Sequence, residues 1–312
     1  MSTSWSSTRA GTRRAIGLGA YALAYAIALV VLAREPGASV VEPLFVLGVL
    51  GIAFPLLALL LTRATTATPD PIAQPRAEAG AALAWLAIFA IGVLGWGFSA
   101  LRAAIAQGTA QELAILAAKL LAMVAIPVLI LGSFGHHPRE LLAPNLRWRA
   151  ITLPLAGMGL ALFGFQAVFG RGLTTLGELG PGAVTLAWAI PACLAWMALE
   201  AGLTEEFLFR RFLQERLSAW SGSDVLAVCV ASLLFGLAHA PGLYLRGAHA
   251  MEGVAAQPSI AWAVAYSIAV ISPAGLLFGT LWARTRSLGL VVLLHGLTDL
   301  LPNLAGFIRT WG

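Results

Sequence analysis

The chain has 312 residues, of which 59% are hydrophobic and 11% are charged, and its formal net charge is +5. A soluble globular domain is about 45–50% apolar and about 25% charged, so this composition excludes an ordinary soluble protein and a disordered chain. The small net charge, with basic residues spread between apolar runs, excludes a nucleic-acid-binding domain. The long, unbroken apolar runs also exclude a transmembrane β-barrel, which leaves a helical membrane protein.

Nine apolar stretches are long enough for a membrane-spanning helix, which needs about 20 residues to cross the hydrocarbon core. The first stretch, 15–33, exceeds the about 7–15 apolar residues of a cleaved signal peptide, so we predict a span there as well. The predicted fold class is therefore all-α: a polytopic helical membrane protein with about nine (eight to nine) transmembrane helices. The predicted spans are 15–33, 44–61, 79–98, 113–132, 150–169, 183–209, 224–240, 259–282 and 287–307.

The basic residues of the connecting segments alternate in number from one side of the predicted membrane to the other. With the tails included, thirteen lie on one side and five on the other. Because cytoplasmic segments carry an excess of Lys and Arg, this alternation supports nine spans with the N-terminus cytoplasmic. Arginine outnumbers lysine by 18 to 1, which favours a bacterial genome rich in G and C, and hence location in the inner cell membrane.

Several residues inside the spans have a structural interpretation. Gly275 and Gly279 form a G-x-x-x-G face, which predicts close helix packing. Cys193 and Cys229 lie in apolar runs, where a free cysteine acts as a small hydrophobic side chain. Lys119 lies inside the fourth predicted span and is expected either to extend to the membrane surface or to pair with a carboxylate.

A charged side chain in the hydrocarbon costs at least about 2.5–3.5 kcal/mol, so the ionisable residues of the spans need an explanation. Nearly all of them lie in the last third of the chain, in three clusters on three spans. The first cluster is the sequence EEFLFR in the sixth span. Its Glu206 and Arg210 are four residues apart, share a helix face and can pair, whereas Glu205 points elsewhere without an obvious local partner.

The second and third clusters each place two residues four apart on an apolar helix. In the seventh span the sequence FGLAH brings Phe235 and His239 to one face. In the ninth span the sequence HGLTD does the same for His295 and Asp299. Such faces on otherwise apolar helices predict a polar interior that the three spans share.

The three clusters can meet if the sixth and seventh spans form a hairpin. Glu205 lies 17 residues before the predicted turn at Gly222 and His239 lies 17 residues after it, so both reach the same height. His295 reaches that height only if the hairpin extends about 12 Å beyond the membrane, at about 1.5 Å per residue. The composition of this extension suits water; its polar residues are Arg210, Arg211, Gln214, Glu215 and Arg216.

Two glutamates, two histidines and an aspartate in one cavity can support hydrolysis. A carboxylate with a histidine can deprotonate a water, and a second polar pair can stabilise the oxyanion of a tetrahedral intermediate. The same residue types could bind a divalent metal such as zinc, although the sequence lacks the H-E-x-x-H spacing of the zincins. They also occur in proton relays, so a proton- or ion-coupled transporter is the alternative, against which the absence of an evident internal repeat argues.

The motifs E-E-x-x-x-R, F-x-x-x-H and H-x-x-x-[ND], in this order on successive helices, resemble those of the CPBP family of intramembrane proteases. That family includes the CAAX prenyl endopeptidases and the bacteriocin-processing proteases. The resemblance implies a catalytic core over 183–312, formed by the sixth to ninth helices, and a divergent N-terminal part over 1–182. It further implies an intramembrane endopeptidase that hydrolyses a peptide bond with a glutamate-activated water.

The resemblance also implies a role for each motif residue. Glu205 would be the general base that activates the water, and His239 would assist it. Glu206 and Arg210 would hold the geometry and the charge balance of the site. Phe235, the first residue of F-x-x-x-H, would have a structural role beside them.

His295 and Asp299 would position the substrate or stabilise the oxyanion. An ionised aspartate cannot donate a hydrogen bond, as asparagine at this position could, so Asp299 is expected to orient His295 instead. The chain has no tight metal-ligand spacing, which favours a metal-free mechanism. With zinc bound, the ligands would be Glu205, His239 and His295.

The expected partners are the lipid bilayer and a membrane-associated protein or peptide, and not a nucleic acid. Candidate substrates are bacteriocin leader peptides, membrane-tethered regulators and C-terminal sorting signals of the kind that myxosortase-like members of the family remove. A catalytically silent member that binds a peptide is the remaining alternative, against which the retained motif residues argue.

Overall fold

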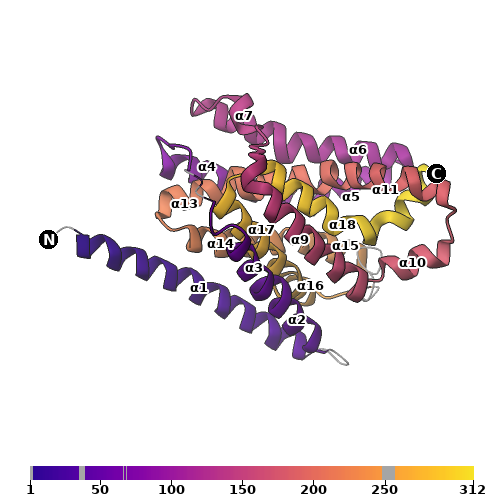
Figure 1. Ribbon diagram of the computed structural model, residues 1–312, viewed down its shortest axis with the longest axis horizontal. Coiled ribbons are helices and arrows are strands. Elements are labelled where there is room, and N and C mark those ends of the chain that lie inside the picture. The colour runs from indigo at the N-terminus through magenta and orange to yellow at the C-terminus, as the bar shows by residue number, and fades with distance from the viewer. Residues whose placement is uncertain (1–2, 35–38, 66, 68, 248–256) are drawn as a thin grey trace. The chain divides into compact units, whose positions relative to one another are not determined.

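The computed structural model describes residues 3–34, 39–65, 67, 69–247 and 257–312, and this part of the chain is helical, without a β-strand (Figure 1). Within it, nine helices are long and apolar enough to cross a membrane, and each overlaps one predicted span. The prediction of an all-α protein with nine spans is therefore confirmed. The nine helices are Gly11–Ala33, Val41–Leu61, Pro75–Ala104, Thr109–Ser133, Ala150–Phe169, Ala183–Ser221, Asp224–Arg246, Ile260–Thr285 and Leu288–Trp311.

Five of these nine helices include π-helical turns, whose backbone hydrogen bonds run i→i+5 instead of i→i+4. The turns change which residues share a face, and they matter most in the sixth span, on either side of α12. The elements are α1 (Thr3–Ala33), α2 (Val41–Val46), η1 (Leu47–Ala53), α3 (Phe54–Leu61), α4 (Pro75–Ile88), η2 (Phe89–Gly97), α5 (Phe98–Ala104), α6 (Thr109–Lys119), η3 (Leu120–Ala125), α7 (Ile126–Ser133), α8 (Pro138–Leu141), α9 (Trp148–Phe169), α10 (Gly172–Leu179), α11 (Ala183–Met197), η4 (Ala198–Leu203), α12 (Thr204–Glu206), η5 (Phe207–Gln214), α13 (Glu215–Ser221), α14 (Asp224–Leu237), α15 (Ala240–Arg246), α16 (Ile260–Tyr266), η7 (Ser267–Ile271), α17 (Ser272–Thr285) and α18 (Leu288–Trp311).

Large apolar side chains are exposed along the spans. Ile91, Leu160 and Val184 are 78%, 76% and 83% exposed, and many other leucines and isoleucines of the spans are exposed as well. A surface of this kind is unfavourable in water and is well matched to lipid chains. The chain is therefore a multi-pass membrane protein.

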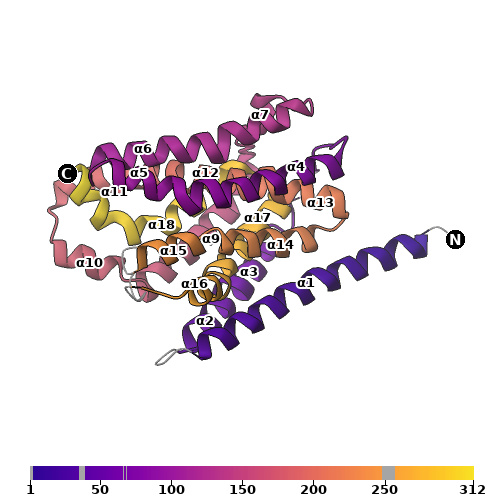
Figure 2. The ribbon, with the colours of Figure 1, turned by 180° about the vertical axis from the view of Figure 1, so that it is seen from behind.

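The chain folds into two compact units, each assembled from segments that are far apart in the sequence. In the first unit α1 packs against α14 and α16, and α15 lies beside α16 (Figure 2). In the second unit α18 packs against α9, α10, α11 and η4. The first unit comprises Met1–Leu56, Thr68–Ser99 and Phe209–Ala283; the second comprises Leu57–Ala67, Ala100–Leu208 and Arg284–Gly312.

Each unit has its own apolar core. In the first, the Tyr21 hydroxyl lies 2.7 Å from the Ser272 hydroxyl and Tyr25 donates to the Pro43 carbonyl at 2.6 Å, so both rings are buried with their polar atoms satisfied. Cys193 and Cys229 are buried free thiols, as expected of small hydrophobic side chains. The first core contains Tyr21, Tyr25, Ala28, Leu32, Cys229, Ala265 and Ala269, and the second contains Ala189, Cys193, Met197, Leu300 and Leu304.

Close helix packing at Gly275 and Gly279 is confirmed in the first unit. A Cβ atom at Gly275 would lie 2.8 Å from the Cα atom of Ser232, and one at Gly279 would lie 3.1 Å from the Val228 side chain. Both glycines belong to α17 and both neighbours to α14. The absence of a side chain therefore sets how closely these two helices approach.

The polar segment at the end of the sixth span is buried inside the protein, so the expectation that its side chains meet water is wrong. That the segment extends beyond the membrane stays a prediction. In the first unit, Arg211 pairs with Asp70 at 2.8 Å and with Glu215 at 2.9 Å, while Arg216 pairs with Glu215 at 3.0 Å and with Glu78 at 3.3 Å. Paired charges can be buried where a single charge cannot. The segment is enclosed because α4 packs against α13 and supplies Glu78; the exposed fractions are 0% for Arg210, 4% for Arg211, 1% for Gln214, 2% for Glu215 and 1% for Arg216.

Adding a methyl group at Gly275 should destabilise the protein. Gly275→Ala forces α14 and α17 apart and should lower the free energy of unfolding by about 1–3 kcal/mol. Gly80→Ala is the matched control, because a Cβ atom there meets no atom within 4 Å. Thermal unfolding in detergent compares the two variants, and equal midpoints would contradict the packing described for Gly275.

Removing the Arg216 guanidinium should destabilise the first unit more strongly. Arg216→Met leaves the buried Glu78 carboxylate without this partner and should lower the free energy of unfolding by about 3–5 kcal/mol. Arg76→Met on α4 is the control, since Arg76 is exposed. Chemical unfolding in detergent measures both, and a loss no larger than that of the control would show that the pair is not needed.

Candidate active site

The second unit brings four of the predicted site residues together around one imidazole. His295 on α18 donates from Nδ1 to Oε1 of Glu206 on α12 at 2.8 Å. Its Nε2 atom lies 3.5 Å from Oδ2 of Asp299 and 3.9 Å from Oε2 of Glu205. Three carboxylates from two spans therefore surround the ring of His295.

The three carboxylates differ in solvent exposure, and this difference limits the role that each can have. The side chain of Glu206 is 0% exposed, that of Glu205 is 13% exposed and that of Asp299 is 30% exposed. Glu206 can therefore hold the ring of His295 but cannot meet a substrate. Glu205 and Asp299 keep part of their surface exposed.

Two glycines allow the sixth and ninth spans to approach closely beside this cluster. A Cβ atom at Gly296, the neighbour of His295, would lie 2.8 Å from the Cα atom of Ala198. A Cβ atom at Gly202 would lie 2.6 Å from the carbonyl oxygen of Val292. The close backbone contact places α12 within hydrogen-bond distance of α18, and it explains the glycine after His295 in the third motif.

Lys119 and Glu200 complete the cluster. The Lys119 ammonium lies 2.5 Å from Oε1 of Glu200 and 3.9 Å from Oε1 of Glu205, so its predicted pairing with a carboxylate is confirmed. Sequence reasoning missed Glu200, because residues five apart do not share a face of a regular α-helix. Glu200 lies inside the π-helical η4 and Glu205 lies two residues after its end, and the wider π-helical turn brings positions five apart closer to one face. The signal in the sequence was Glu200 itself, a carboxylate in an apolar span that needs a partner.

His239 lies in the first unit, directly after α14. Its Nδ1 atom donates to the Phe235 carbonyl oxygen at 2.9 Å, and the two rings make an edge contact with centroids 5.0 Å apart, so the predicted shared face is confirmed. The Arg210 guanidinium lies 5.1 Å from the centroid of the Phe235 ring. Because a carbonyl only accepts, the proton of the neutral imidazole sits on Nδ1 and Nε2 keeps its lone pair. This tautomer suits a proton acceptor.

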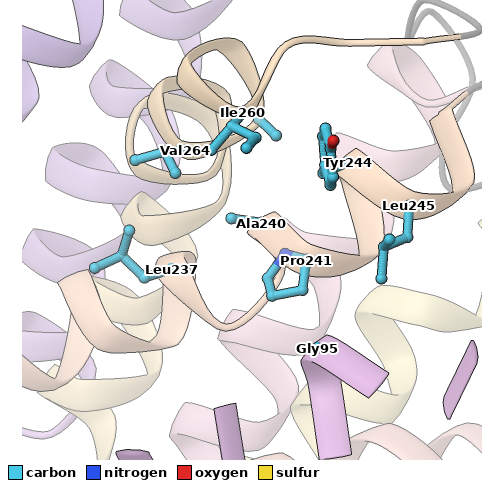
Figure 3. A pocket seen from close by; sticks show the side chains of 9 residues that line it. Gly95, Leu237, Ala240, Pro241, Tyr244, Leu245, Ile260 and Val264 are labelled. Carbon is cyan, nitrogen blue, oxygen red and sulfur yellow. The ribbon is translucent and has the colours of Figure 1, made fainter. Parts of the chain in front are cut away.

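The first unit has an apolar pocket of about 400 Å³, and one of its lining residues is Ala240, which follows His239 in the sequence (Figure 3). Ile260 and Val264 of α16 line one side of it, and Ala240 and Tyr244 of α15 line another, with the Tyr244 hydroxyl as its polar group. The pocket has room for an apolar group. Its lining residues are Gly95, Leu237, Ala240, Pro241, Tyr244, Leu245, Ile260, Ala263 and Val264.

Two predicted contacts stay predictions, namely the approach of His239 to Glu205 and the pairing of Glu206 with Arg210. Among the described residues, no three His, Cys, Asp or Glu side chains form a group that could hold a metal ion. The zinc alternative combines Glu205 and His295 of the second unit with His239 of the first, and it stays a prediction.

The fold and the cluster define a multi-pass helical membrane protein with a buried carboxylate–histidine site. Residues 186–301 match the family model of the Rce1-like type II CAAX prenyl endopeptidases. The matched segment lies within the predicted 183–312 core and contains all three motifs. No curated protein and no solved structure matches the chain.

The hydrogen bond between His295 and Glu206 can be measured with a double-mutant cycle. Glu206→Leu and His295→Leu should each destabilise the protein, and their coupling should be about 1.5–3 kcal/mol, because one partner is charged and both are buried. The free energy of unfolding in detergent is the readout. In a control cycle Glu206→Leu is paired with Thr310→Val, which lies near the other end of α18.

The control cycle should give a coupling below about 0.5 kcal/mol. Equal couplings in the two cycles would show that the contact between Glu206 and His295 is not specific.

Proposed function

We propose that the protein is an intramembrane endopeptidase that hydrolyses a peptide bond of a membrane-associated protein or of a C-terminal or leader peptide. The observation that carries this proposal is the cluster of Glu205, Glu206, His295 and Asp299 inside the segment that matches the Rce1-like model. A partly exposed glutamate beside an imidazole held in one orientation can act as the general base that deprotonates a water.

In the proposed reaction Glu205 removes a proton from a water, and the resulting hydroxide adds to the scissile carbonyl carbon. His239 assists this step by accepting a hydrogen bond at Nε2, and the protonated His295 donates from Nε2 to the oxyanion of the tetrahedral intermediate. The intermediate collapses, the carbon–nitrogen bond breaks, and the protonated Glu205 returns the proton to the leaving amine. One water is consumed, and the products are a carboxylic acid and an amine.

In the proposal the other motif residues position the two histidines, His295 and His239. Glu206 fixes the ring of His295 through Nδ1, and Asp299 orients it from the side of Nε2. Arg210 and Phe235 support His239, through the contact of the guanidinium with the ring and the hydrogen bond to the Phe235 carbonyl. All four are positioning residues.

We expect the substrate to carry an apolar side chain close to the scissile bond. The apolar pocket lined by Ala240, the residue after His239, can receive such a side chain. With the N-terminus cytoplasmic, cleavage takes place near the cytoplasmic face of a bacterial inner membrane. Leader peptides, membrane-tethered regulators and C-terminal sorting signals, the last as for myxosortase-like proteases, have this character.

Substitution of the proposed base should abolish cleavage. Purified protein in detergent is incubated with a library of apolar peptides, and new termini are identified by mass spectrometry. Glu205→Gln should lower kcat by at least about 100-fold, because it removes general-base catalysis. His239→Ala and His295→Ala should also be inactive while they remain folded. Glu178→Gln is the matched control, since Glu178 is exposed on α10, and it should cleave like the wild type.

Cleavage by Glu205→Gln at the wild-type rate would contradict the mechanism. Buried carboxylates paired with a lysine are also typical of proton relays. Proton or ion flux in proteoliposomes, lost in Glu205→Gln and found without any peptide cleavage, would favour a transporter. Peptide binding without cleavage or flux would favour a catalytically silent member.

A further inference from the structure

Lys119 is the single lysine of the chain and lies at the junction of α6 and η3, in the fourth span. It is outside both the 186–301 match and the three motifs. We propose that Lys119 is a positioning residue that fixes the carboxylate of Glu205, while Glu200 holds the lysine ammonium in place. This inference rests on the proposed function and adds a residue from the N-terminal spans to the site.

The first argument is the geometry of the Glu205 carboxylate. Its Oε1 atom faces the ammonium of Lys119 at 3.9 Å, and its Oε2 atom faces Nε2 of His295 at the same distance. Each oxygen thus faces a different nitrogen, supplied by a different span. Both distances exceed that of a hydrogen bond, so the carboxylate is oriented by electrostatic attraction from two sides, which favours one direction of its basic lone pairs.

The second argument is that Lys119 is itself held firmly. Its ammonium lies 2.5 Å from the Glu200 carboxylate and donates to the Glu200 backbone carbonyl at 3.3 Å. The Thr204 hydroxyl donates to the same carbonyl at 2.6 Å. An ammonium has three N–H donors, so two of them engage Glu200 and the third can point toward Glu205.

The third argument is the charge of the cluster. Glu200, Glu205, Glu206 and Asp299 contribute carboxylates to the second unit, and the side chains of Lys119 and Glu200 are only 16% and 17% exposed. Removing the ammonium alone leaves two neighbouring carboxylates in an apolar span. A loss of activity could then reflect poor folding instead of a misplaced base, and the experiment must separate the two effects.

The experiment compares three variants with the wild type in the peptide-cleavage assay, and kcat and KM are determined separately. Lys119→Met should lower kcat by about 10- to 100-fold with KM nearly unchanged, because the base is present but misplaced. The double variant Lys119→Met/Glu200→Gln should recover the thermal stability, since it removes both partners, but not kcat. Lys119→Arg, which keeps the positive charge, should recover part of kcat. Arg309→Met, at an exposed site on α18, is the control and should behave like the wild type.

A wild-type kcat in the double variant would overturn the proposal, because Lys119 would then only neutralise Glu200. A wild-type kcat in Lys119→Met, in a protein that Glu205→Gln inactivates, would overturn it while leaving the protease function intact. If Lys119→Met does not fold, the double variant and Lys119→Arg decide the question. If the wild type cleaves no peptide, the proposed function fails first and this inference fails with it.

Discussion

The hydrogen bond from His295 to Glu206 joins the sixth and ninth spans inside the second unit, at 2.8 Å. It forms only because Gly202 and Gly296 let the two backbones approach more closely than side chains would allow. The acceptor is the buried carboxylate of Glu206, and the bond fixes the imidazole of His295. The Nε2 atom of that ring lies 3.9 Å from Oε2 of Glu205.

The same physical constraint governs the polar residues of the first unit. A charge in an apolar interior is tolerated when a partner of opposite sign is buried with it. Arg216 pairs with Glu78 of the third span, and in the second unit Glu200 pairs with Lys119 of the fourth span. In both units a helix outside the matched segment supplies the missing partner. Spans outside the segment that matches the Rce1-like model therefore supply partners for charges inside that segment.

The carboxylates of the cluster in the second unit differ in their exposed fractions. Glu206 is fully buried, whereas Glu205 is 13% and Asp299 is 30% exposed. In the proposed mechanism the buried Glu206 orients His295, and the more exposed Glu205 activates the water. In the first unit, the hydrogen bond to the Phe235 carbonyl selects the tautomer of His239 that can accept a proton at Nε2. Both histidines thus have one nitrogen engaged in orientation and the other available for chemistry.

Much of this protein follows from the sequence by itself. The nine spans and the shared face of Phe235 and His239 could be predicted because hydropathy and helical periodicity are local properties. The partnership of Lys119 with Glu200 could not, because it depends on a span 81 residues away and on the π-helical turns of η4. The burial of Arg216 was also decided by tertiary structure, since only the packing of α4 against α13 brings a carboxylate to it. The sequence shows which charges must be paired, and the fold decides with which partner.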